Sequence, residues 1–299
     1  MTAHVLQANA GRLPLADASV DLVVTSPPYF GLRSYEDGGE HVTEQIGAEA
    51  TPSEFVAALI ECTREMVRVL RPGGSIWVNL GDKYATYAGN RSKGRTSLQG
   101  ATDRARPVIP RKGGLDGGGE VRWKSLMGIP WRYALACTDD LGLVLRAEVV
   151  WSKTNGVPES VRDRARRTHE TWFHLVREPR HYANQAVIRP VDHDGRRLLA
   201  PPSVREVAMA PLRVPDHLPK HYAAFPPEWP RWIIEGWCPP GGTVLDPFGG
   251  TGTTAMVADV MGRVGISADL SHDYSRVARW RVSDPRQRSK VRPSLTPLW

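Results

Sequence analysis

The protein has 299 residues, a net charge of +7 and three cysteines. This length suits one sizeable α/β domain with insertions, or two small domains. The chain has no N-terminal apolar signal and no apolar run long enough to span a bilayer, so we expect a cytoplasmic protein without a membrane partner. Cys62, Cys137 and Cys238 are an odd count without C-x-x-C spacing, which predicts reduced, mostly buried thiols in a reducing compartment.

The first predicted strand covers residues 20–24 and ends in the turn Thr25-Ser26-Pro27-Pro28-Tyr29. Two consecutive prolines fix φ, remove amide donors and leave carbonyl oxygens free to accept hydrogen bonds. Such a stiff turn can hold acceptors around a planar amino group while the tyrosine ring covers its face. An ordinary Ser-Pro-Pro turn after a strand is the alternative interpretation.

A helix, a strand and a basic segment follow this turn. Thr51-Pro52-Ser53-Glu54 is a capping box that opens a predicted helix over residues 52–70, and residues 75–80 predict the next strand. Between Lys83 and Lys124 the sequence has ten Lys or Arg, three acids and eight glycines. This composition predicts a basic, Gly-rich insertion over residues 83–125 that contacts nucleic-acid phosphates, with a solvated loop as the alternative.

The middle of the chain has a less regular pattern. Residues 131–140 predict a helix and residues 143–151 a longer strand, but residues 156–221 are irregular. An arginine cluster (Arg162, Arg164, Arg166 and Arg167) opens this region, and a helix-like segment over residues 168–174 and a proline-rich stretch follow. Within that segment His169 and His174 are spaced wrongly for the H-E-x-x-H metal helix, and no cysteine is near, so we predict no metal site.

The last third of the chain contains a second motif. After a predicted helix over residues 228–237 and a strand over residues 243–245 comes Asp246-Pro247-Phe248-Gly249-Gly250-Thr251-Gly252-Thr253-Thr254. A helix over residues 255–261, a strand over residues 264–268, Asp269 and a helix over residues 273–282 follow it. A strand, a glycine-rich turn and a helix start predict a nucleotide-type pocket, because glycines allow close backbone approach and the helix N-terminus offers free amides.

The nature of the nucleotide depends on the residues of this turn. Residues 250–255 fit the loose dinucleotide fingerprint, with Asp269 placed to bind ribose hydroxyls, so NAD is one candidate. However, the Asp246 carboxylate suits a ligand with a positive charge nearby, and Phe248 makes the turn bulkier than a pyrophosphate cradle. S-adenosylmethionine has an ammonium, a sulfonium, a ribose and an adenine but no phosphate, and it therefore fits this turn better.

Strands that alternate with helices predict an α/β fold with a doubly wound, mainly parallel, Rossmann-like sheet. In such sheets ligands bind beyond the carboxyl ends of the strands. Both Thr25 and Asp246 follow predicted strands. One crevice can therefore hold both turns although they are far apart in the sequence.

The pair TSPPY and DPFGGTGTT, in this order, resembles the DNA amino-methyltransferases of the permuted beta arrangement, which methylate N4 of cytosine or N6 of adenine. Similarly placed segments extend the resemblance over most of residues 5–280: residues 70–82, 128–132, 151–155 and 158–160, and His221, Phe225 and Pro226. The resemblance implies a single methyltransferase domain over residues 1–299, with residues 156–221 as its target-recognition region. It also implies S-adenosylmethionine as cofactor and double-stranded DNA as substrate.

The resemblance implies that Ser26, Pro27, Pro28 and Tyr29 are catalytic. Ser26 Oγ and the Pro27 carbonyl would each accept one amino hydrogen of a flipped base, while Tyr29 stacks on its ring. The cofactor would contact Thr25, Phe225, Asp246, Pro247, Phe248, Gly249, Gly250, Thr251, Gly252, Thr253 and Asp269.

A serine at this position of the family's motif more often accompanies cytosine N4, and an aspartate adenine N6. We therefore expect methylation of cytosine N4, with adenine N6 as the alternative. A non-catalytic DNA-binding relative and an NAD-dependent oxidoreductase stay open as hypotheses from other classes. A cognate restriction endonuclease and a second copy of the chain are candidate partners, and a prokaryotic or phage protein associated with the nucleoid is expected.

Overall fold

The computed structural model describes residues 2–31, 36–37, 40–41, 45–86, 119–156, 158–188, 194–196, 199–219 and 224–291. Its strands are β1 (Ala3–Gln7), β2 (Val20–Thr25), β3 (Glu36–Asp37), β4 (Glu40–His41), β5 (Leu70–Leu80), β6 (Val144–Ser152), β7 (His169–Val176), β8 (Val204–Glu206), β9 (Thr243–Asp246) and β10 (Val264–Asp269). Its helices are α1 (Pro52–Val69), α2 (Ile129–Asp139), α3 (Gln185–Ile188), α4 (Glu228–Trp237), α5 (Thr253–Val260), α6 (His272–Ser283) and α7 (Pro285–Arg288).

Eight strands form one sheet in the order β1-β10-β9-β2-β5-β7-β6-β8, and β3 pairs with β4 separately. Strand β7 runs antiparallel to both of its neighbours, whereas the other neighbouring pairs are parallel. The predicted α/β fold with a mainly parallel sheet is therefore confirmed.

Strand β7 corrects the prediction of a helix-like segment over residues 168–174. It lies between β5 and β6, and Trp172, Phe173, Leu175 and Val176 are all buried. A strand that is covered on both faces shows no alternation of polar and apolar residues, so its sequence cannot be told from a buried helical segment. The helical spacing argument for His169 and His174 therefore does not apply.

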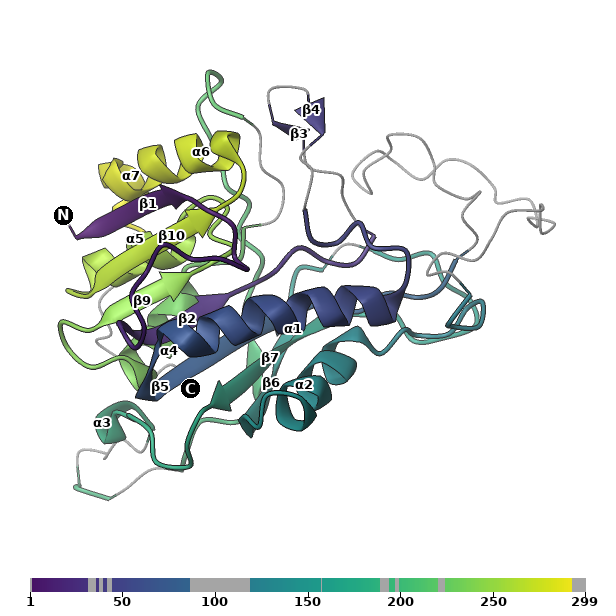
Figure 1. Ribbon diagram of the computed structural model, residues 1–299, viewed down its shortest axis with the longest axis horizontal. Helices are drawn as coiled ribbons and strands as arrows, with labels where there is room; N and C mark the ends of the chain where they lie inside the picture. Colours follow the sequence, from purple (N-terminus) through teal and green to yellow (C-terminus); the bar gives the residue numbers. More distant parts are fainter. Residues whose placement is uncertain are drawn as a thin grey trace.

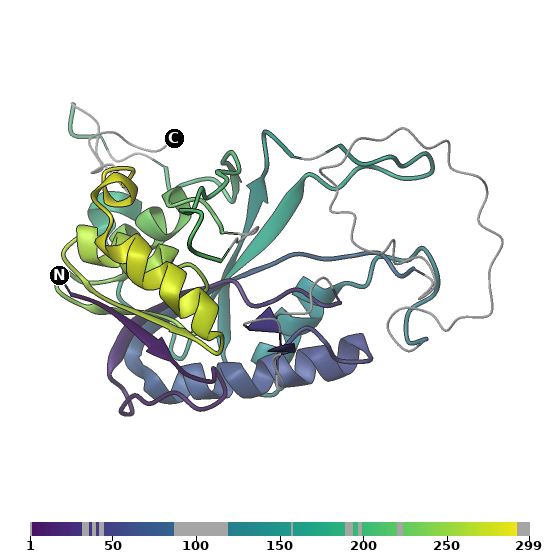
Figure 2. The same cartoon turned by 90° about the horizontal axis from the view of Figure 1, so that it is seen from above.

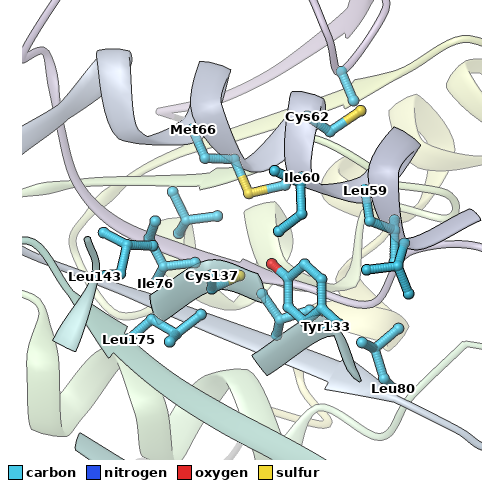
Figure 3. Close-up of a cluster of buried hydrophobic side chains, with 14 of the residues drawn as sticks. Leu59, Ile60, Cys62, Met66, Ile76, Leu80, Tyr133, Cys137, Leu143 and Leu175 are labelled. Atoms are coloured by element: carbon cyan, nitrogen blue, oxygen red, sulfur yellow. The ribbon is translucent and has the colours of Figure 1, made fainter. Parts of the chain in front are cut away.

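Helices cover both faces of the sheet. In Figure 1, α1 and α2 lie in front of the sheet, and in Figure 2 they lie on the opposite side of it from α6. The core between α1, α2 and the sheet includes Leu59, Met66, Ile76 and Tyr133, which Figure 3 shows pointing toward one another. Each such buried apolar side chain stabilises the fold by roughly 1.5–3 kcal/mol.

The start of α1 follows the predicted capping box. The Thr51 side chain accepts a hydrogen bond from the Glu54 amide at 3.1 Å, and Glu54 Oε2 accepts one from the Thr51 amide at 3.1 Å. The end of the helix differs from the prediction by one residue, because Leu70 already pairs with Val20 as the first residue of β5. The register of β5 against β2 then shifts, and pairing resumes where Leu22 meets Ser75. Residues 71–74 therefore lie within β5 as an irregularity, whereas the prediction placed them before the strand.

The chain changes direction across the sheet between β2 and β9. From β2 the chain passes through α1 to β5 on one side, whereas from β9 it passes through α5 to β10 on the other. The neighbours β2 and β9 are parallel, so their carboxyl ends share one edge. Such a switch point leaves a crevice at the carboxyl ends of the strands, because the two connecting helices lie on opposite faces.

Other predictions have mixed outcomes. Cys62, Cys137 and Cys238 are buried and form no disulfide, and burial raises the pKa of each thiol to about 12. No described helix has the length and apolar character that a bilayer crossing needs. Most of the predicted basic insertion, residues 87–118, lies outside the described residues, as does His221.

Candidate active site

Side-chain hydrogen bonds join the segment of β2 and its proline turn to the segment of β9 and its glycine turn. Thr25 Oγ1 donates to Asp246 Oδ1 at 2.6 Å, and both residues are buried. Asp246 also accepts from Thr254 Oγ1 at 2.9 Å and from the Phe248 amide at 3.2 Å. The two segments that the sequence analysis singled out are 221 residues apart along the chain and lie in direct contact.

This use of Asp246 differs from the expectation that its carboxylate lies beside a charge of the ligand. Only 1% of the residue is exposed, and its oxygens are bonded to the protein itself. Burial raises the pKa of Asp246 to about 7, while the hydrogen bonds from Thr25 and Thr254 act in the opposite direction. The geometry favours a structural role, in which Asp246 joins the two turns.

Ser26 and Tyr29 of the proline turn share a partner on the neighbouring strand. Tyr29 Oη donates to Asn79 Oδ1 at 2.8 Å, and Ser26 Oγ lies 3.4 Å from the same oxygen. Asn79 Nδ2 donates to the Thr171 carbonyl at 3.3 Å, which fixes the orientation of the amide. Asn79 was not predicted as a site residue, although a polar residue near the end of an apolar strand is a usable signal in the sequence.

The environment of Tyr29 depends on two further residues. A methyl group at Gly81 would lie 2.5 Å from Tyr29 Cε2, so the ring packs directly on the backbone of residue 81. Burial and the nearby Glu170 carboxylate raise the pKa of Tyr29 well above its usual value. Glu170 itself forms an ion pair with Lys153, and both side chains are largely buried. The phenol therefore stays protonated and acts as a hydrogen-bond donor.

The glycine turn packs too closely for side chains at particular positions. A methyl group at Gly249 would lie 2.0 Å from Ser267 Oγ, and Gly252 has a φ of +74°. Asp269 at the end of β10 accepts from the Gly250 amide at 2.8 Å and from the Ser271 amide at 2.9 Å. These contacts place the half-exposed carboxylate of Asp269 against the backbone of the turn.

Two threonines of this turn point inward. Thr251 and Thr253 are 2% and 3% exposed, and their hydroxyls accept hydrogen bonds from the buried Arg281 on α6. Pro247 is buried as well, whereas Phe248 and Gly250 are partly exposed. The side chains of Thr251 and Thr253 are therefore turned away from a ligand, and the backbone of the turn is better placed to contact one. Arg281 was also missed by sequence reasoning.

Phe225 precedes α4 and borders a cluster of tryptophans. Its ring is perpendicular to that of Trp172, with centroids 5.8 Å apart, and Trp172 stacks on Trp229 at 5.3 Å. Trp172 on β7 is the cross-strand neighbour of Asn79 on β5. The aromatic cluster therefore lies directly beside the residue that binds Ser26 and Tyr29.

The predicted arginine cluster divides into two kinds of residue. Arg164 lies 3.6 Å from the centre of the Tyr84 ring and forms an ion pair with Glu159, and Arg167 Nη1 lies 3.7 Å from Asp82 Oδ2. Asp82 in turn accepts from the amides of Gly128 and Ile129 at the start of α2. Arg162 and Arg166 are exposed. Arg164 and Arg167 are thus held in ion pairs within the protein.

The residues around the glycine turn fit S-adenosylmethionine. Gly249 packs against Ser267 inside the protein while Gly250 is partly exposed, Asp269 offers a carboxylate suited to ribose hydroxyls, and Phe225 and Phe248 offer aromatic surface. Carboxylates at Asp246 and Asp269 oppose a pyrophosphate in the same place. Within the described ranges no three His, Cys, Asp or Glu side chains are grouped to hold a metal ion.

Comparison with known proteins gives consistent results. A protein family described as DNA methylase matches residues 20–279 of this chain. The type II methyltransferase M.XycI of Xanthomonas campestris pv. cyanopsidis is 38% identical over 272 residues, which cover 91% of this chain and 83% of M.XycI. The type II methyltransferase M.SmaI of Serratia marcescens is 34% identical over 262 residues, which cover 88% of this chain and 84% of M.SmaI.

Solved structures share the fold. PvuII DNA methyltransferase, described as cytosine-N4-specific, superposes with a TM-score of 0.68 at 18% identity, over 97% of this chain and 90% of that chain. TTHA0409 from Thermus thermophilus, solved in complex with S-adenosyl-L-methionine, superposes with a TM-score of 0.58 at 21% identity, over 94% of this chain and 93% of that chain.

Proposed function

Because this chain belongs to the DNA methylase family of N6-adenine and N4-cytosine methyltransferases, we propose that it methylates N4 of a flipped cytosine in double-stranded DNA. The family uses S-adenosylmethionine, and DNA is its substrate. The observation that carries the proposal is the placement of Ser26 and Tyr29 of the proline turn around Asn79. The strand before this turn is bonded to the start of the glycine turn through Thr25 and Asp246.

The target nitrogen needs help from the protein because it is a weak nucleophile. The lone pair of an exocyclic amine is delocalised into the base ring. Ser26 can direct its hydroxyl hydrogen toward Asn79 Oδ1, which leaves its oxygen lone pairs free to accept an amino hydrogen. Such a bond, with a second one to the Pro27 carbonyl, draws the nitrogen toward tetrahedral geometry and frees its lone pair for attack. The amine loses one proton during or after methyl transfer, and this proton leaves to solvent water, directly or through Ser26 Oγ.

Tyr29 holds the flipped base in this mechanism. Its hydroxyl is bonded to Asn79 and one side of its ring packs on Gly81, so its orientation is fixed before the base arrives. A preoriented ring that stacks on the base fixes the angle of attack. S-adenosylmethionine supplies a methyl group on a sulfonium, which is already a strong electrophile. Neither an activated cysteine nor a metal has a part in this scheme.

The cofactor site is assigned to the glycine turn. We assign the ribose hydroxyls to Asp269, the aromatic contacts to Phe225 and Phe248, and backbone contacts with the cofactor to Gly249, Gly250 and Gly252. Buried side chains hold this turn in place through hydrogen bonds within the protein: those of Thr25, Asp246, Thr251 and Thr253. Pro247 and Pro28 stiffen the two turns.

Two observations support cytosine over adenine. The acceptor at the end of β2 is a hydroxyl, which is weaker than a carboxylate and matches the serine that accompanies N4 methylation in the family. In addition, the PvuII enzyme, which is described as cytosine-N4-specific, has the same fold.

DNA would reach the site along the edge that carries both turns. We propose that target recognition belongs to residues 156–221, apart from the core strand β7 within this range, and that the basic segment 83–125 contacts DNA phosphates. The exposed Arg162 and Arg166 are suited to phosphate contact. The type II relatives also support a cognate restriction endonuclease as a partner, and a homodimer stays a prediction.

The test is to incubate the protein with unmethylated bacterial DNA and S-adenosylmethionine, digest the DNA and identify the methylated nucleoside by mass spectrometry. We expect N4-methylcytosine, and its formation should disappear in Ser26→Ala. N6-methyladenine alone would contradict the assignment of the base. No methylated nucleoside on DNA that contains all short recognition sites would contradict methyl transfer itself.

A further inference from the structure

Arg281 on α6 is a buried cation without a counter-ion. The residue is 4% exposed, and its Nη1 donates to Thr251 Oγ1 at 2.7 Å and to Thr253 Oγ1 at 2.6 Å. Its Nε is buried and has no hydrogen-bond partner, and in the described part of the chain no carboxylate forms an ion pair with it. Neutral hydroxyls are therefore the partners that this guanidinium has.

This arrangement is costly for the folded protein. Burial lowers the pKa of the Arg281 guanidinium to about 10, and burial is the cause of the shift, with no compensating carboxylate. Arg288, close by in sequence, contrasts with it because it pairs with Asp259. A buried charge without a counter-ion is unfavourable unless an anion completes the site. The chain thus tolerates at Arg281 a charge that a bound anion would compensate.

The position of this cation relative to the glycine turn indicates which anion that is. Helix α5 begins at Thr253, its N-cap is Gly252, and no side chain caps its free amides. The N-terminus of a helix carries a partial positive charge, and Arg281 adds a full charge behind the same residues. Of the two nearby carboxylates, Asp269 accepts from the Gly250 amide earlier in the turn, whereas Asp246 lies beside the start of α5 and is bonded to Thr254 Oγ1 and the Phe248 amide.

S-adenosylmethionine has a single anionic group, the carboxylate of its amino-acid part. We propose that Arg281 is a positioning residue for the cofactor: it holds the turn through Thr251 and Thr253 and sets a positive charge behind the backbone amides that receive this carboxylate. The inference rests on the proposed placement of the cofactor against the glycine turn. Arg281 does not touch the cofactor in this arrangement, since the two threonines lie between them.

The experiment compares two ligands that differ only in the carboxylate, S-adenosylmethionine and decarboxylated S-adenosylmethionine. Dissociation constants are measured by calorimetry for the wild type, Arg281→Met and Arg281→Lys, after circular dichroism has shown that each variant is folded. We expect Arg281→Met to bind S-adenosylmethionine roughly tenfold more weakly, because the positive charge behind the amides that receive the carboxylate is lost. Its affinity for the decarboxylated ligand should change by less than about threefold.

Arg281→Lys keeps the charge and should keep a preference for the ligand with the carboxylate. If Arg281→Met loses the same amount of affinity for both ligands, Arg281 only stabilises the turn, and the inference is overturned. If Arg281→Met does not fold, the lysine variant decides: a folded Arg281→Lys protein that no longer distinguishes the ligands contradicts the inference.

Gly249→Ala, measured beside these variants, tests the placement of the cofactor separately. If it leaves both affinities unchanged, the cofactor lies elsewhere and the proposed site is wrong. If it weakens both ligands while Arg281→Met fails to distinguish them, only the role of Arg281 is contradicted.

Discussion

The proline turn after β2 and the glycine turn after β9 lie on neighbouring parallel strands, but they present different parts of the chain. In the proline turn the polar side chains of Ser26 and Tyr29 are half-buried and share Asn79 as partner. In the glycine turn the polar side chains of Thr251 and Thr253 point inward to Arg281. The backbone is what remains to face a ligand there.

This difference follows from the residues that stiffen each turn. Prolines fix φ and hold side chains in a defined direction, whereas glycines remove the side chain so that the backbone can approach closely. Changes in the proline turn should therefore affect the chemical step, and changes in the glycine turn should affect cofactor binding. The following predictions test that separation.

The largest effect is expected in the proline turn. Ser26→Ala and Tyr29→Ala should each lower kcat for DNA methylation at least about a hundredfold, because they remove an acceptor and the stacking ring. Calorimetry should find the affinity for S-adenosylmethionine unchanged. Ser283→Ala, an exposed serine at the end of α6, is the matched control and should behave as wild type. A Tyr29→Ala protein that methylates DNA at the normal rate refutes the stacking role.

The next effect is expected in the glycine turn. Gly249→Ala places a methyl group 2.0 Å from Ser267 Oγ and 3.1 Å from Ser267 Cα, so the turn must move. We expect the Kd for S-adenosylmethionine to rise roughly thirty- to a hundredfold, with kcat at saturating cofactor much less affected. Gly73→Ala is the control, because a methyl group there meets nothing within 4 Å. The separation of the two turns fails if Gly249→Ala lowers kcat and leaves Kd unchanged.

Asn79 should show an intermediate effect on the chemical step alone. Asn79→Ala removes the oxygen that orients Ser26 and Tyr29, and we expect kcat to fall roughly ten- to thirtyfold. Asn79→Asp retains an acceptor at this position and should lose less activity than Asn79→Ala. Single-turnover kinetics at saturating S-adenosylmethionine measure this step. Equal activity of wild type and Asn79→Ala would show that the proline turn holds its side chains without help.

The smallest effect concerns the contact between the turns. Burial raises the folded-state pKa of Asp246 to about 7 from its usual value of 3.8, so the folded protein binds this proton more tightly than the unfolded chain. The stabilisation from this proton is present below the unfolded-state pKa and is lost as pH rises through the folded-state pKa, by about 1.4 kcal/mol between pH 6 and 8. Asp246→Asn cannot ionise and should lack this dependence.

Urea unfolding of both proteins at pH 6, 7 and 8 measures the difference in their free energies of unfolding. That difference should shift by the stated amount over the range, in favour of the variant at high pH. A difference that is the same at all three pH values would mean that Asp246 is ionised throughout, in spite of its burial.

The sequence carried the parts of this protein that depend on local chemistry. The capping box at Thr51, the helices α4 and α6, the strands β2, β9 and β10 and both turns could be predicted, because caps, prolines, glycines and apolar runs act within a few residues. The contact of the two turns also followed, since parallel strands of one sheet present their carboxyl ends at one edge.

The tertiary structure decided what depends on neighbours. Strand β7 looked helical because both its faces are buried, and only its position between β5 and β6 reveals its state. Asn79 joins the site through its hydrogen bond to Tyr29, which lies 50 positions away in the sequence. Arg281 joins it through Thr253, which lies 28 positions away. Thr251 and Thr253 turned inward for the same reason. A sequence motif shows which groups are present, but the direction in which each group points is set by the buried partner that satisfies it.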